Sequence, residues 1–152
     1  MNFLELSDEL LKDAEKYGSY DKNIPFQYRI IFKLLDDSDY SAAKKFIEAN
    51  KKYFENEYNY LLLDSAIEYC INNVVNEDGN ICDTVRASDN IYRPTPEAVG
   101  FIKYLLENGA DPHLPKNFNQ MEHIDDLERD ASQQCDCKFD CSEIKLLIGK
   151  YM

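Results

Sequence analysis

The segment 95–112 constrains the fold more than any other part of the chain, because it encodes one short helix with a marked start and a marked stop. Thr95 provides an N-cap, followed by a proline and an early acid, which are typical of a first helical turn. Apolar residues then recur at helical spacing up to Leu106, and Gly109 can adopt the left-handed conformation that ends a helix. We therefore expect a short amphipathic helix that buries its apolar side against neighbouring helices.

The same signals predict seven helices, which begin near residues 3, 25, 40, 60, 96, 119 and 140. Asp39, Asn119 and Asp140 are the expected N-caps of the third, sixth and seventh helices, and the last two are followed three residues later by Glu, as in a capping box. Apolar runs that could form strands, such as Val74-Val75 and Ile81-Cys82, are short. The sequence thus predicts a single all-α domain over 1–152.

The predicted helices form three pairs, at 25–54, 60–108 and 119–150. Each pair is amphipathic and cannot bury its own apolar side, so stacking the three pairs would create a continuous core. The helix within 1–18 would then cap the first end of the stack.

The residues 101–113 resemble the second helix and outgoing turn of an ankyrin repeat. The resemblance is carried by Leu105-Leu106-Glu107-Asn108-Gly109-Ala110-Asp111-Pro112. The residues 61–66 are similar to a first repeat helix, without the usual Thr-Pro-Leu-His, and 142–147 to a terminal second helix. The resemblance spans about 26–152 in architecture and 97–113 in clear motif, and implies an ankyrin-like stack of about three helix pairs. Other helix-pair solenoids remain alternatives.

Two long connections depart from the ankyrin pattern, the insertion at 72–94 and a shorter one at 133–139. Both lie between the two helices of a pair, so we expect them at the same edge of the stack. Insertions on one side of a solenoid often mark its binding surface, and they also accumulate in tolerant surface loops. Both interpretations stay open here.

The chain is strongly acidic, with 17 basic against 29 acidic residues and a net charge of −12. This charge repels nucleic-acid phosphates and anionic membranes, and it favours a basic protein partner. Eight acids lie within 122–143, against Arg129 and Lys138. They could form either a solvated helix surface or a docking surface.

The five cysteines are an odd number, which disfavours a complete disulfide framework. Cys135, Cys137 and Cys141 could hold a metal together with Cys82 or His113, but the spacing is unlike that of paired zinc ligands, so reduced thiols are the default interpretation. The sequence also lacks the common nucleophile, phosphate-loop and metalloprotease motifs. We therefore expect neither catalysis nor a cofactor.

These features predict a cytoplasmic protein-binding module that is monomeric by itself, with no signal peptide and no membrane span. A short, acidic, ankyrin-like chain resembles the immunity proteins of bacterial toxin systems, which implies a cognate toxin, often a basic nuclease, as partner. A regulatory or effector-type adaptor and a metal-binding protein are the alternatives. The expected partner-binding residues are Tyr58, Asp83, Arg86, Asp89, Tyr92, Arg93, Glu122, Asp125, Asp126, Glu128 and Asp136.

Overall fold

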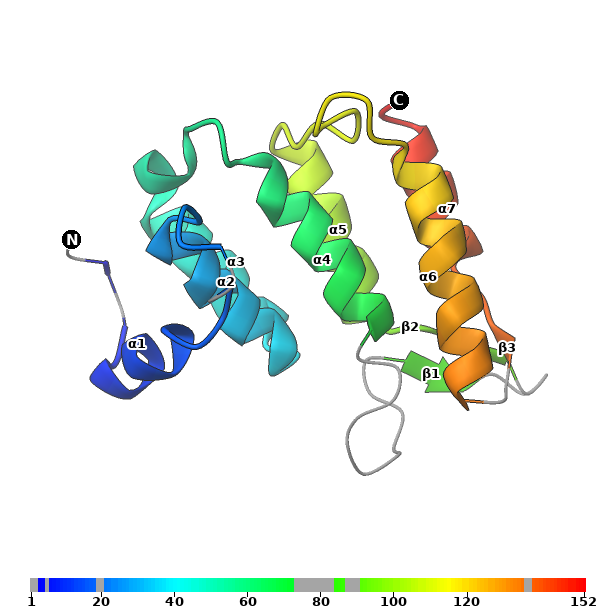
Figure 1. Cartoon of the computed structure of the whole chain (residues 1–152), viewed down its shortest axis with the longest axis horizontal. Coiled ribbons are helices and arrows are strands. Elements are labelled where there is room, and N and C mark those ends of the chain that lie inside the picture. The colour runs from blue at the N-terminus through cyan, green and yellow to red at the C-terminus, as the bar shows by residue number, and fades with distance from the viewer. Residues whose placement is uncertain (1–2, 5, 19–20, 73–83, 87–90, 136–137) are drawn as a thin grey trace.

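The computed structural model describes residues 3–4, 6–18, 21–72, 84–86, 91–135 and 138–152, with backbone only for 72, 84–86 and 134–135. The described chain is mostly helical, so the all-α prediction is confirmed (Figure 1). The helices are α1 (Asp8–Ala14), α2 (Phe26–Asp36), α3 (Tyr40–Ala49), α4 (Tyr60–Asn72), α5 (Pro96–Glu107), α6 (Gln120–Cys135) and α7 (Ser142–Gly149), with a 3-10 turn η1 (Lys51–Phe54). Three short strands join them, β1 (Thr84–Arg86), β2 (Ile91–Pro94) and β3 (Lys138–Phe139).

The helices form two layers (Figure 1). Helices α2, α4 and α6 lie side by side in one layer, where α4 packs against both neighbours. Behind them, α5 contacts both α3 and α7. Helix α1 packs on α2 at the outer end, although it is shorter than the expected 3–17. The order of the pairs is the one expected from the sequence, while the ankyrin likeness stays a prediction.

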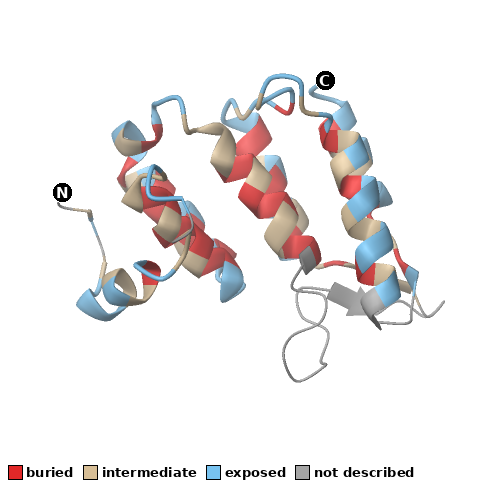
Figure 2. Ribbon diagram, viewed as in Figure 1, coloured by how far each residue is buried: buried red, intermediate tan, exposed pale blue. Residues whose placement is uncertain are grey.

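The core runs through both layers and contains side chains from all three helix pairs (Figure 2). Its fully buried branched aliphatic residues include Ile30, Ile31, Leu35, Leu63, Ile67, Ile71, Ile102, Ile124, Ile144 and Ile148. Within the layer of α2, α4 and α6, helix α6 contributes least, because among its described side chains only Ile124, Ala131 and the polar Gln120 are buried.

The end of α5 has the geometry that its sequence predicts. Gly109 has φ +97°, the Ala110 N–H donates to the Leu105 carbonyl at 3.0 Å, and the Gly109 N–H donates to that of Leu106 at 3.2 Å. This pair of bonds is a Schellman motif. At the other end, Thr95 Oγ1 accepts from the Ala98 N–H at 3.2 Å, as an N-cap does.

The short strands were not expected from the sequence. Strands β1 and β2 pair antiparallel, and β2 also pairs parallel with β3, in the register Ile91↔Lys138 and Tyr92↔Phe139. Strands of two to four residues are too short to give a clear alternation of apolar and polar side chains. The sheet joins parts of both insertions, so the prediction that they share one edge is confirmed (Figure 1).

The seventh helix begins one residue later than predicted. Its N-cap is Cys141 rather than Asp140, which instead accepts from the Ser142 N–H at 2.9 Å. No helix in the described part of the chain is long and apolar enough to cross a membrane.

Candidate functional site

The predicted binding residues of the insertion edge are only partly within the described structure. Asp83, Asp89 and Asp136 lie outside the described residues, and Arg86 is described only as backbone in β1. Tyr92 and Arg93 lie on β2 and are partly buried. An ion pair of 3.6 Å joins Arg93 Nε to Asp140 Oδ2, so this arginine ties the sheet to the start of α7.

Tyr58 is not brought near this edge. It lies just before α4, whereas the sheet follows the other end of that helix (Figure 1). The Tyr58 ring is partly buried, and its centroid lies 6.4 Å from that of Tyr28. Tyr58 would therefore belong to a different surface from the insertion edge.

The predicted acids of α6 fall on an exposed surface of that helix. Glu122, Asp126 and Asp130 recur every four residues and are exposed, and we call them the acidic stripe. Asp126 Oδ1 pairs with Arg129 Nη2 at 3.1 Å, and the neighbouring Asp125 Oδ1 accepts from Lys145 Nζ at 2.7 Å. The surface is acidic but partly neutralised by the chain's own cations.

Glu128 has a role within the chain. Its Oε2 accepts from the backbone N–H of Cys141 at 2.6 Å, and its Oε1 lies 3.4 Å from Lys145 Nζ. The side chain is 25% exposed, so these contacts are partly shielded from water. Glu128 thus supplies an acceptor at the start of α7 from α6, in addition to the local acceptor Asp140, which binds the Ser142 N–H.

The cysteine segment supports reduced thiols more than a metal site in its described part. Cys137 and the side chain of Cys135 lie outside the described residues, and Cys141 is fully buried. Burial and, to a smaller extent, the charge of Glu128 raise the pKa of the Cys141 thiol. A metal ligand must be a thiolate, which this environment disfavours.

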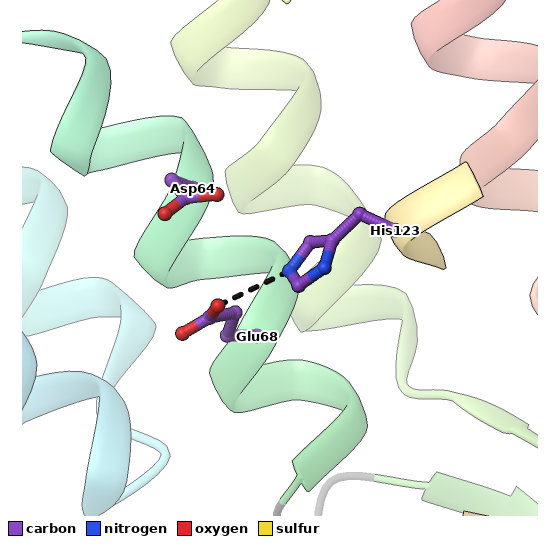
Figure 3. Close-up of side chains that lie close together, drawn as sticks. All are labelled: Asp64, Glu68 and His123. Carbon is purple, nitrogen blue, oxygen red and sulfur yellow. Dashed lines mark hydrogen bonds and ion pairs between the residues drawn. The ribbon is translucent and has the colours of Figure 1, made fainter. Parts of the chain in front are cut away.

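A different cluster of side chains lies between α4 and α6 (Figure 3). Asp64 and Glu68 project from consecutive turns of α4, and His123 reaches toward them from the first turns of α6. Nε2 of His123 lies 3.1 Å from Glu68 Oε1. One potential ligand atom from each residue lies within 4.8 Å of the other two.

The interior side of this cluster contains polar atoms without hydrogen bonds. Asp64 Oδ1 is buried and makes no hydrogen bond with the described residues. Gln120 is 0% exposed, and neither its amide oxygen nor its amide nitrogen makes a hydrogen bond of standard geometry with them. The Gln120 amide nevertheless lies near enough to Asp64 to lower the pKa of its carboxyl. Burial, followed by the charge of Glu68, outweighs that effect and the opposing charge of His123, and raises the pKa of Asp64 to about 6.

The cluster is accessible to small ions from one side. A groove of about 270 Å³ is lined by Asp64, Glu68 and other residues of α4, by Phe32 of α2, and by Gly18 and Ile24 before α2. The His123 side chain is 22% exposed and that of Glu68 is 41% exposed. The arrangement therefore combines a solvent entry, three convergent donors and an interior polar residue.

Sequence reasoning missed this cluster, although two signals were present. Asp64 and Glu68 are four residues apart in an otherwise apolar helix, and Gln120 and His123 are three apart in another. Such spacings place each pair on one side of its helix. Stacking of the second and third helix pairs would bring the two sides together.

No family model, curated protein or solved structure matches this chain.

Proposed function

We propose that this chain is a non-catalytic protein-binding module whose partner is a basic protein. The observation that supports it is the acidic stripe of Glu122, Asp126 and Asp130 on an exposed surface of α6. The sheet that joins the two insertions lies at the C-terminal end of the same helix (Figure 1). Two features predicted independently from the sequence therefore lie next to each other.

The position of α6 leaves the stripe open to a large partner. Helix α6 is the last member of its layer, with α4 on one side and no described helix beyond it on the other (Figure 1). Exposed like charges at one-turn spacing slightly destabilise a helix by itself. They accelerate the approach of a positively charged partner and penalise acidic ones, which gives selectivity more than affinity.

The partner class that we favour is a basic toxin domain, which the chain would bind and block as an immunity protein. The small size, net charge of −12 and ankyrin-like segment support this choice by resemblance. Acidic side chains would occupy the place of substrate phosphates in such a toxin, which requires neither catalysis nor a cofactor. A regulatory or effector-type adaptor that binds another protein is the alternative function.

A matched pair of charge variants tests the proposal. The stripe variant carries Glu122→Lys, Asp126→Lys and Asp130→Lys, and the control carries Glu15→Lys, Glu48→Lys and Glu57→Lys. All six acids are exposed, and both variants change the net charge by the same amount. Affinity capture from the source cell, read by quantitative mass spectrometry, compares the wild type with both.

We expect the wild type and the control to retain a basic protein that the stripe variant loses. The association rate should fall steeply between low and high salt, because exposed charges are screened. Equal capture by the stripe variant would contradict binding through α6. Co-expression with the captured protein then separates the classes, since an immunity protein restores growth of cells that the partner otherwise kills and an adaptor does not.

A further inference from the structure

We propose that Asp64, Glu68 and His123 bind a divalent transition-metal ion, with Zn²⁺ as the reference ion, and that the ion joins the second helix pair to the third. The site is separate from the acidic stripe and does not depend on the proposed function. Its ligands come from two helices that pack side by side, α4 and α6 (Figure 3).

The spacing of the donor atoms is close to that of a metal site. Zinc bonds to imidazole nitrogen and carboxylate oxygen are about 2.0–2.2 Å, which places neighbouring ligands of a tetrahedral ion about 3.3 Å apart. The separation of His123 Nε2 and Glu68 Oε1 is 3.1 Å, and all three donors lie within 4.8 Å of one another. Tetrahedral coordination would require the most distant of the three donors to move closer to the other two.

The polar atoms behind the cluster are a second and independent observation. Asp64 Oδ1 is buried without a hydrogen bond, and Gln120 is fully buried with neither amide atom in a hydrogen bond of standard geometry, although its amide interacts with the Asp64 carboxyl. Buried polar groups are nearly always satisfied, so unpaired ones require an explanation. A cation coordinated by Asp64 would compensate its carboxylate, and the adjacent Gln120 amide could then orient that carboxylate from behind, as outer residues of metal sites do.

The donor set points to the class of ion. An imidazole with two carboxylates is a nitrogen and oxygen set that suits Zn²⁺ and similar first-row metals, whereas Mg²⁺ and Ca²⁺ prefer oxygen ligands alone. Three protein ligands leave one tetrahedral position for water, and two of them, Asp64 and Glu68, line a groove that is open to solvent.

The test uses the full-length chain with Cys135→Ser and Cys137→Ser, so that the paired thiols of this segment cannot supply a competing site. This background and its variants are freed of metal by chelation and titrated with ZnCl₂ by isothermal calorimetry. The chain has two histidines, so His123→Ala has a matched control in His113→Ala. His113 is an exposed loop residue whose ring Nδ1 lies 3.0 Å from Asp111 Oδ1, outside the cluster.

We expect one equivalent of Zn²⁺ to bind the cysteine-substituted background and its His113→Ala variant with the same Kd. The Kd of the His123→Ala variant should be at least tenfold higher. Free Zn²⁺ at about a hundred times Kd should raise the Tm of the background by about 5–10 °C. Co²⁺ bound in its place should give visible bands of a tetrahedral ion without the near-ultraviolet band of a thiolate ligand.

Glu68→Gln provides a second variant that keeps the shape of the side chain, and it should also bind at least tenfold more weakly even if His123→Ala unfolds. Stoichiometric binding with unchanged Kd in Glu68→Gln would overturn the proposal. So would a Tm of the background that does not respond to Zn²⁺, or a thiolate band in the Co²⁺ spectrum.

Discussion

Replacement of Glu128 by alanine should weaken the attachment of α7 to α6. The mutation removes the acceptor of the Cys141 N–H, at 2.6 Å, and one of the two carboxylates that contact Lys145. Loss of an N-cap acceptor costs about 0.5–2 kcal/mol. The ion pair adds at most about 1 kcal/mol, because Glu128 and Lys145 remain 25% and 29% exposed and water screens them.

The expected loss is therefore about 2 kcal/mol in the free energy of unfolding for Glu128→Ala. In a chain of 152 residues this corresponds to a fall in Tm of about 4–8 °C. Glu128→Gln keeps an acceptor oxygen and loses the charge, so about 1 kcal/mol or less should be lost. Urea unfolding followed by circular dichroism measures both variants.

The control for this experiment is Asp130→Ala, which removes an exposed acid from the interior of the same helix. We expect it to change the free energy of unfolding by less than about 0.5 kcal/mol, as surface substitutions usually do. If Glu128→Ala were no less stable than Asp130→Ala, the cap inferred from the geometry would have no energetic role.

Three further predictions concern local features. Hydrogen bonds from the Ser142 hydroxyl and N–H lower the pKa of Asp140 in the folded state, so the charged carboxylate stabilises the fold above its ordinary pKa of about 3.9, and this stabilisation is lost as the pH falls through the folded pKa. Asp140→Asn should therefore lose less stability on acidification than the wild type, and identical profiles of stability against pH would argue against this role. Gly109→Ala should lower the free energy of unfolding by about 1 kcal/mol, because Gly109 has φ +97°. Gly100→Ala should raise it by about 0.5–1 kcal/mol, because Gly100 lies in the middle of α5 with open space around it. Urea unfolding measures both, and a change of the same sign in the two variants would contradict the backbone argument. The Cys141 thiol, buried and with a raised pKa, should react with a thiol reagent only on unfolding, as followed by mass spectrometry in native buffer and in urea.

The sequence predicted the helices well because their signals are local. Thr95, Asp39 and Gly109 act on backbone groups within a few residues, and each has the expected conformation or hydrogen bond. At the start of α7 the predicted Asp140 accepts from the Ser142 N–H, but a second acceptor, for the Cys141 N–H, comes from Glu128, thirteen residues earlier and in another helix. A cap that depends on tertiary contact leaves no local pattern.

The two candidate sites also differ in whether their residues lie within one helix or come from two. The acidic stripe could be found from the sequence because Glu122, Asp126 and Asp130 lie on one helix at a fixed period. The cluster of Asp64, Glu68 and His123 could not be assembled until α4 and α6 were known to be neighbours, since 55 residues separate Glu68 from His123. The small sheet was missed for a related reason, because β2 and β3 come from different insertions and stabilise each other only after the helices have stacked.

These observations converge on α6 and on what holds it in place. Its described buried apolar side chains are Ile124 and Ala131, fewer than those of α2 or α4, so packing attaches it less strongly than the other helices of its layer. Polar links complete the attachment, through His123 to Glu68 and through Glu128 to the start of α7. A polar link depends on charge and on bound ions, whereas burial of aliphatic side chains does not. Within its layer, the helix that carries the proposed docking surface is therefore the one whose attachment depends most on polar contacts, whereas α2 and α4 are held mainly by buried apolar side chains.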